Sequence, residues 1–145
     1  MKRFLVGALA IWVLATVVPV ASAAEKKPQG NVQNGRAVFN GKGNCLACHG
    51  KDAYLNQRPQ QSPEIAKMIE ELVPPPANFR DPATLQAKRG DVLFRDIKDG
   101  RAHSGMFPKK FLTDAEIGDL VAYLLSIKAE MSKAGMGRQE KGGQP

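Results

Sequence analysis

The most constraining feature of the sequence is the five-residue motif Cys45-Leu46-Ala47-Cys48-His49, which contains both cysteines of the 145-residue chain. On a helical turn, residues three apart lie on the same side, so both sulfurs can reach one partner while His49 projects just beyond them. This C-x-x-C-H spacing is typical of c-type haem attachment, in which each thiol adds to a vinyl group and the histidine binds iron. We therefore predict one haem, attached through Cys45 and Cys48, with His49 as an iron ligand.

Three other uses of the two cysteines have to be weighed against haem attachment. A structural disulfide is possible in an oxidising compartment. A thioredoxin-like redox pair also uses C-x-x-C, but it lies among strands, and the sequence shows no clear strand pattern. A zinc site would need further ligands, and His103 is the one histidine left to provide them. The helical patterns, the leader and His49 together favour haem over these three.

Residues 1–23 have the three-part organisation of a secretory signal peptide. Lys2 and Arg3 form a charged start, an apolar stretch follows, and Ala-Ser-Ala at 21–23 supplies the small residues required for cleavage. We predict cleavage before Ala24, which would leave 122 residues, lower the formal charge from +7 to +5 and place the domain in the periplasm. The alternative is an uncleaved membrane anchor, for which the apolar run is short. In either case we expect the domain to lie outside the cytoplasm.

Apolar spacing and helix-start residues predict an all-α domain over residues 31–130, after a polar lead-in over 24–30 and before a flexible tail over 131–145. We expect helices over 31–40, from Ser62-Pro63-Glu64 to the prolines at 74–76, over 91–98, and from a Thr113–Glu116 capping box to near Lys128. The expected apolar faces of the last three are Ile65, Met68, Ile69 and Leu72; Leu93, Phe94 and Ile97; and Ile117, Leu120, Val121 and Leu124.

A haem that only exchanges electrons benefits from a second strong axial ligand, and methionine opposite histidine raises the reduction potential. Met106 lies in a loop over 100–108 that is bounded by glycine and proline, so its thioether can approach iron while helices surround the ring. We expect Met106 to be this ligand in preference to His103, for which we expect an exposed loop position. The other methionines are assigned elsewhere: Met68 to the core, and Met131 and Met136 to the tail.

These motifs resemble those of class I c-type cytochromes of the bacterial, cytochrome-cbb3-subunit-like type. Residues 35–39 are similar to the family's first helix, 104–106 to its axial-methionine loop, and 112–117 with 120–124 to its final helix. The resemblance covers most of residues 31–128. It implies a small cytochrome c fold with three to five helices around one covalently bound haem.

The resemblance also implies roles for single residues. His49 becomes the proximal ligand and Met106 the distal one, although Phe107 stands here where the family often has proline. Gly35 and Phe39 would pack against the last helix around Tyr123, because a glycine lets two helices cross closely. A backbone carbonyl of the proline loop, from Pro74, Pro75 or Pro76, would fix the proximal imidazole.

The function implied is one-electron transfer between redox proteins through the exposed haem edge, so we expect a carrier and not an enzyme. The carrier could also be the cytochrome subunit of a larger redox complex. A haem enzyme or gas sensor with an open iron position, and a haem-free thiol–disulfide protein, remain the competing functions.

The charge of +7 favours acidic partners over nucleic acid, because no run of Lys and Arg exceeds two residues. Lys42, Lys109 and Lys110 flank the two iron-binding loops and could steer such partners, or they could be merely solvated. We expect no stable membrane insertion after signal cleavage.

Overall fold

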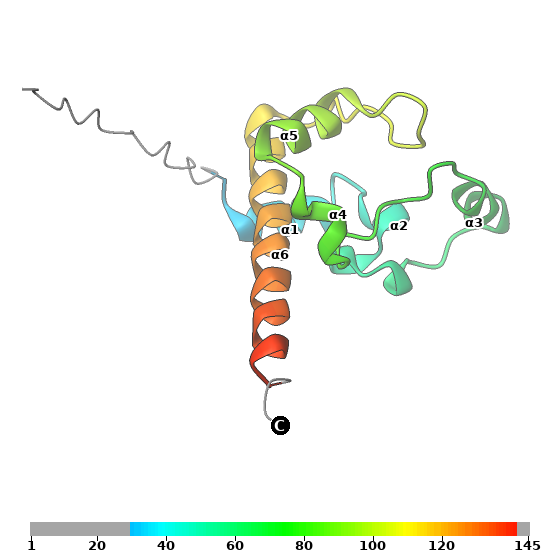
Figure 1. Ribbon diagram of the computed structural model, residues 1–145. Helices are drawn as coiled ribbons and strands as arrows, with labels where there is room; N and C mark the ends of the chain where they lie inside the picture. Colours follow the sequence, from blue (N-terminus) through cyan, green and yellow to red (C-terminus); the bar gives the residue numbers. More distant parts are fainter. Residues whose placement is uncertain (1–29, 142–145) are drawn as a thin grey trace, which may run out of the picture.

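The structure is a computed structural model that describes the backbone of residues 30–141 and the side chains of residues 30–134. The predicted signal peptide and all of the lead-in except Gly30 lie outside these residues. The described chain forms six α-helices and no strand, which confirms the all-α prediction, although the resemblance implied only three to five helices (Figure 1). They are α1 (Val32–Asn40), α2 (Leu46–His49), α3 (Pro63–Glu70), α4 (Pro82–Gln86), α5 (Gly90–Asp99) and α6 (Asp114–Lys141), with 3₁₀ turns η1 (Lys51–Ala53) and η2 (Leu55–Gln57).

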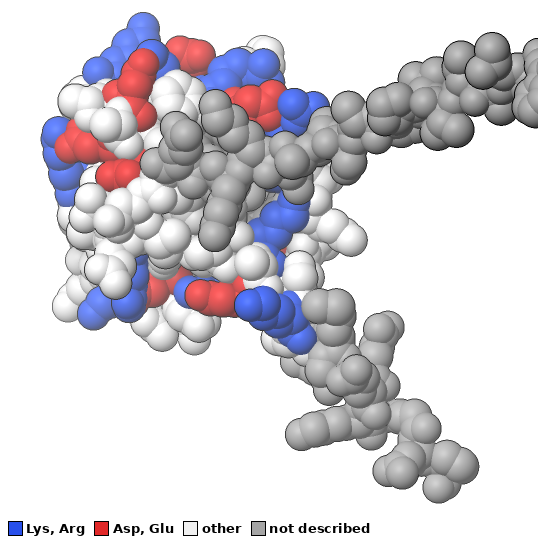
Figure 2. All heavy atoms as spheres, turned by 90° about the vertical axis from the view of Figure 1, so that its left-hand side faces the viewer, with Lys and Arg blue, Asp and Glu red and all other residues white. Residues whose placement is uncertain are grey.

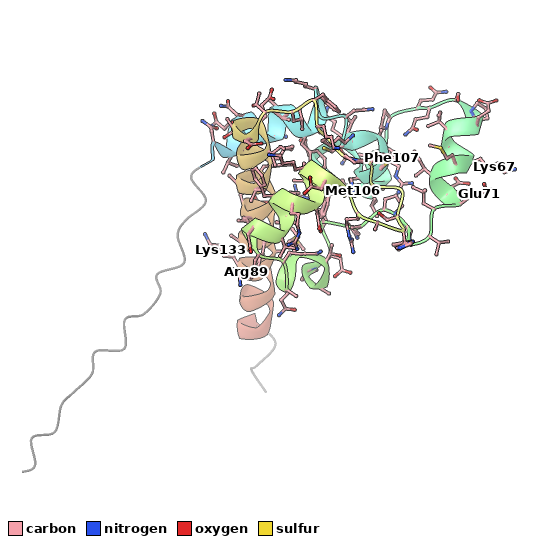
Figure 3. All side chains as sticks on the ribbon, turned by 90° about the horizontal axis from the view of Figure 1, so that it is seen from above. Lys67, Glu71, Arg89, Met106, Phe107 and Lys133 are labelled. Carbon is pink, nitrogen blue, oxygen red and sulfur yellow. The ribbon has the colours of Figure 1, made fainter. Side chains whose placement is uncertain are left out.

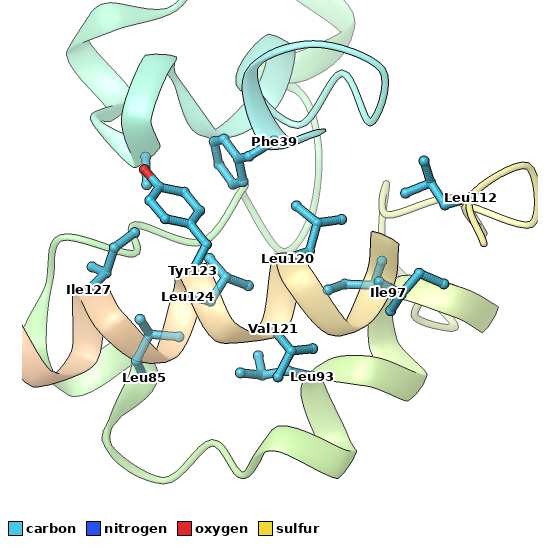
Figure 4. Packing of buried hydrophobic residues seen from close by; sticks show 12 residues of the cluster. Phe39, Leu85, Leu93, Ile97, Leu112, Leu120, Val121, Tyr123, Leu124 and Ile127 are labelled. Atoms are coloured by element: carbon cyan, nitrogen blue, oxygen red, sulfur yellow. The ribbon is translucent and has the colours of Figure 1, made fainter. Parts of the chain in front are cut away.

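The helix α6 forms the centre of the domain, and α1, α4 and α5 all pack against it (Figure 1). The crossing with α1 is close because Gly35 is buried against α6: a Cβ atom there would overlap the Asp119 carbonyl and lie 2.9 Å from Tyr123 Cβ. One helical turn later, the Phe39 ring packs edge-on against Tyr123, with ring centroids 5.5 Å apart (Figure 4). This is the packing that the resemblance implied.

The hydrophobic core lies along the face of α6 that these helices cover. The predicted stripe of α6 is buried throughout, and from α5 Leu93 and Ile97 join it (Figure 4). Phe94 is partly buried against this core. Residues missed by the sequence patterns complete the core, among them Leu85 on α4. The α4 helix carries the same start signal as α3, because Asp81 caps it and Pro82 occupies its first turn.

The two ends of α6 differ in how well the sequence predicted them. At the start, Thr113 and Glu116 form the expected capping box: the Glu116 amide donates to the Thr113 hydroxyl at 3.2 Å, and the Thr113 amide donates to the Glu116 carboxylate at 2.8 Å. The predicted end near Lys128 is wrong, because the helix continues to Lys141 through much of the segment expected to be a flexible tail. Residues after Lys128 include good helix formers and no proline before 145, and single glycines only weaken a helix.

The helix α3 begins as predicted, with the Ser62 hydroxyl accepting from the Ile65 amide and Pro63 in the first turn. It stands apart from the helices around α6 (Figure 1). Our expectation that Met68 packs in the core is therefore wrong: Met68 is 47% exposed, and Ile69 is the buried residue of this face. Helical periodicity identifies an apolar face but does not tell whether a helix or a cofactor cavity covers it.

An ionic cluster joins the end of α1 to the segment after α2. The Arg36 guanidinium donates to both carboxylate oxygens of Asp52, at 2.7 and 2.6 Å, and Asn40 donates to the same carboxylate at 2.6 Å. These hydrogen bonds lower the pKa of Asp52 to about 2. Arg80 donates to the backbone carbonyl of the same residue, Asp52, at 2.9 Å, and its guanidinium lies over the Tyr54 ring.

The pKa of Asp52 predicts a specific acid sensitivity. Because the folded pKa lies below the ordinary value of about 3.9, ionised Asp52 stabilises the fold above about pH 4, and this contribution is lost as the pH falls toward 2. We expect the free energy of unfolding of the wild type to fall more between pH 7 and pH 3 than that of Asp52→Asn. Urea titrations followed by circular dichroism at the two pH values measure this difference. Equal losses in both proteins would contradict the assignment.

Candidate functional site

The C-x-x-C-H motif forms the single helical turn that its spacing predicted. The carbonyl of Cys45 accepts from the amides of Cys48 and His49, at 3.2 and 2.9 Å, and α2 covers the residues from Leu46 to His49. Both cysteines are free thiols and partly buried. The turn ends at Gly50, whose φ of 79° suits glycine and where a Cβ atom would overlap the Tyr54 carbonyl.

The imidazole of His49 is held on two sides. Its Nδ1 lies 3.0 Å from the Ala77 carbonyl, and because a carbonyl can only accept, Nδ1 carries the proton and Nε2 keeps its lone pair for a metal. The ring of Phe79 stacks on it with centroids 4.5 Å apart. The expectation that a proline carbonyl fixes the ring is wrong by one residue, because Ala77 follows directly after Pro74–Pro76. Burial lowers the pKa of His49, which favours the neutral form that binds iron.

Met106 lies in a loop whose backbone is fixed by hydrogen bonds on both sides. Its carbonyl accepts from the Arg101 amide at 3.0 Å, and its amide donates to the Ser104 hydroxyl at 3.2 Å. The side chain of Leu72 packs directly on Gly105, so the loop also contacts the segment after α3. In Figure 3 Met106 lies between the helices around α6 and the separate α3, where Lys67 and the capping residue Glu71 are labelled.

One cavity brings these groups together. Its volume is about 580 Å³, within the usual range for ligand sites, and both cysteines, His49 and Met106 line it. Its walls are mainly apolar, contributed by α3, the proline loop, α5 and α6; they include Ile65, Met68, Ile69, Leu72, Phe79, Leu93, Ile97 and Leu124. Two thiols, an imidazole with a free nitrogen, a thioether and apolar walls match the chemical requirements of a covalently held haem.

The Cytochrome c family profile matches residues 32–128, about two thirds of the chain. The chain belongs to the cytochrome c family. Members bind covalently attached haem c and are typically electron carriers rather than enzymes, so this cytochrome is a haem-binding electron carrier. No curated protein and no solved structure matches the chain at a significant level. Within residues 30–141, no helix of the cytochrome is long and apolar enough to cross a membrane.

The competing uses of the cysteines find little support in the geometry of this cytochrome. Burial raises the pKa of the Cys45 thiol to about 11, whereas a redox-active thiol of the thioredoxin type needs a lowered pKa. In the part of the chain that the structure describes, no three His, Cys, Asp or Glu side chains gather as a zinc site requires. His103 is exposed and does not line the cavity.

The cavity also has a charged side that the sequence did not reveal. Lys88, Asp96 and Arg101 line it together: the Lys88 ammonium lies 3.1 Å from the Asp96 carboxylate and the Arg101 guanidinium 3.8 Å from it. Lys88 and Arg101 could hold the two carboxylates that haem carries. These residues lie far apart along the chain from the C-x-x-C-H motif and follow no motif of their own, so only the fold brings them to the cavity.

Proposed function

We propose that this cytochrome is a periplasmic one-electron carrier whose single haem is attached through Cys45 and Cys48 and whose iron is ligated by His49 and Met106. The observation that carries the proposal is that all four side chains line the same mainly apolar cavity. When bound, haem supplies the one-electron chemistry, with iron alternating between the ferric and ferrous states.

The residues of the chain would bind and orient the cofactor, and the mainly apolar walls of the cavity would limit the access of water to it. The Ala77 carbonyl and the Phe79 ring fix the plane of the His49 imidazole and its tautomer. The hydrogen bonds of Arg101 and Ser104 hold the Met106 backbone in place. With haem bound, His49 and Met106 would supply two strong ligands to the iron, which suits electron exchange and would leave no position for a substrate.

Within the family, we assign the chain to the bacterial, cytochrome-cbb3-subunit-like type on the motifs at 35–39, 45–50, 104–106, 112–117 and 120–124 taken together. The signal-peptide pattern over 1–23 supports export to the periplasm. The same electron-transfer chemistry would serve a free carrier or the cytochrome subunit of a larger redox complex.

Optical spectra of the mature protein test the ligation and the function together. We expect a low-spin c-haem spectrum, the weak far-red sulfur-to-iron band in the oxidised form, and no response of the reduced form to carbon monoxide. A rapid shift with carbon monoxide would replace the carrier by an enzyme or sensor with an open iron position. A colourless protein from a host competent to attach haem would refute the cytochrome function.

We further propose that redox partners with acidic faces dock beside the Met106 loop. Lys109 lines the cavity and the neighbouring Lys110 is exposed, and the exposed rings of Phe107 and Phe111 lie beside them in sequence. Lys42 is left out of this docking surface, because its ammonium is held by the Glu116 carboxylate at 2.7 Å. On the face turned away from α3, basic and acidic side chains of the described residues are interspersed (Figure 2). Such a mixed surface does not select for a partner of either charge.

Small-molecule oxidants of opposite charge test the docking surface without a known partner. We expect Lys109→Glu with Lys110→Glu to slow oxidation by anionic hexacyanoferrate(III) several-fold at low salt and to speed oxidation by a cationic cobalt complex. Stopped-flow spectroscopy at low and high ionic strength measures both rates. The control Lys133→Glu with Lys128→Glu makes the same charge change on α6. Equal effects of the two double variants would mean that net charge, and not these lysines, controls the encounter.

A further inference from the structure

The haem-attachment turn has two backbone carbonyls that its own helix does not satisfy. The Cys45 carbonyl accepts from the amides of Cys48 and His49, and the Leu46 carbonyl accepts from the Gly50 amide. At Gly50 the chain leaves the helical path, so no backbone amide of the described residues donates to the carbonyls of Ala47 or Cys48. The Asp52 amide, which a continuing helix would direct to Cys48, donates to the Asn40 side chain at 2.9 Å.

A single loop satisfies both carbonyls with side chains. In this capping loop, residues 55–61, the Arg58 Nε donates to the Cys48 carbonyl at 2.7 Å and the Gln61 Nε2 donates to the Ala47 carbonyl at 2.7 Å. Both hydrogen bonds are partly buried. A helix end that lacks backbone partners needs such donors, and a cation also complements the negative end of the helix dipole.

The two donors differ in charge. The guanidinium of Arg58 carries a positive charge and is held at the carbonyl of the residue directly before His49, whereas the Gln61 amide is neutral. A fixed positive charge therefore lies close to the proposed proximal ligand.

We propose that Arg58 is a positioning residue that fixes the haem-attachment turn through the Cys48 carbonyl and raises the reduction potential of the haem through its charge. The inference rests on the proposed attachment of haem at Cys45 and Cys48 with His49 as ligand. One electron taken from a donor lowers the charge of the ferric centre by one, so a nearby cation favours the reduced state. At an effective dielectric constant of about 20, a unit charge roughly 10 Å away changes such an equilibrium by about tenfold.

Equilibrium redox titration of the holoprotein separates the charge from the hydrogen bond. Arg58→Gln keeps an N–H donor but removes the charge, and we expect the ferrous-to-ferric ratio at a fixed solution potential to fall about three- to tenfold; a tenfold change corresponds to 59 mV for one electron. Arg58→Lys keeps the charge and should retain most of the potential. Gln61→Leu removes a neutral cap and should lower stability to urea. Lys133→Gln removes a charge from the outer part of α6 and should change neither quantity.

Two results would overturn the inference. One is an unchanged potential in Arg58→Gln, and the other is an equal shift in Arg58→Gln and Arg58→Lys, which would assign the effect to structure and not to charge. The optical spectrum of each variant distinguishes this failure from failure of the proposed function. A normal low-spin c-haem spectrum with an unmoved potential rejects the role of Arg58 alone, whereas a wild-type protein without haem rejects the attachment itself.

Discussion

Replacing Met106 with alanine should open one coordination position of the haem iron while the protein stays folded. The Met106 backbone is held by Arg101 and Ser104 through its carbonyl and amide, and the substitution leaves both hydrogen bonds in place. We expect the far-red sulfur-to-iron band to disappear and the reduced form to bind carbon monoxide rapidly. The reduction potential should also fall, because a thioether ligand favours ferrous iron. Absorption spectra, carbon monoxide binding and a redox titration measure the three effects.

Met68 provides the matched control, because it also lines the cavity but comes from α3. Alanine at this position should leave the sulfur-to-iron band and the response to carbon monoxide as in the wild type. The reverse result, in which Met68→Ala loses the band and Met106→Ala keeps it, would transfer the ligand role to Met68. A band that survives in both variants would exclude each of these methionines as the ligand.

Replacing Gly35 with alanine should cause a large loss of stability. The new Cβ would overlap the Asp119 carbonyl on the backbone of α6, and a backbone group cannot turn aside as a flexible side chain can. The two helices would have to separate, which would loosen the packing of Phe39 against Tyr123. We expect a loss of about 2–3 kcal/mol in the free energy of unfolding, measured by urea titration of the holoprotein.

Gly118, which also lies on α6, provides the control: the same glycine-to-alanine substitution there should raise stability instead of lowering it. Among the described residues, a Cβ atom at Gly118 would meet no atom beyond its chain neighbours and its own helix backbone within 4 Å. Because alanine favours the helix over glycine, Gly118→Ala should raise the free energy of unfolding by about 0.5–1 kcal/mol. A loss at Gly118, or no loss at Gly35, would show that the helices do not cross in the manner described.

The elements that the sequence predicted correctly are those decided by neighbouring residues. The Ser62-Pro63 start of α3, the Thr113–Glu116 capping box and the end of α5 at Gly100 all depend on hydrogen bonds or backbone angles within a few positions. The helical turn of the C-x-x-C-H motif is local in the same sense. The one end that failed, near Lys128, carries no strong stop signal, since glycine weakens a helix far less than proline does.

The surroundings of the site followed from contacts between distant parts of the chain. Ala77 lies 28 residues from His49, and no local pattern distinguishes its carbonyl from those of the three prolines before it. Lys42 is paired with a carboxylate, because its ammonium donates to Glu116, 74 residues away. Met68 is a further case. Its spacing places it on the apolar face of α3, and this spacing is the same whether another helix or a cavity lies against that face.

The sequence by itself therefore determined the all-α class, most helix starts and the candidate groups for haem attachment, because spacing and capping operate over one or two helical turns. Only the tertiary structure decided which carbonyl orients His49, which apolar face lines the cavity, and which cations remain free. These depend on the loops that follow α2 and α3 folding back on the C-x-x-C-H turn. Arg58 illustrates the division: ten residues after Cys48 it is an ordinary loop arginine in the sequence, and in the fold it caps the turn that holds the haem.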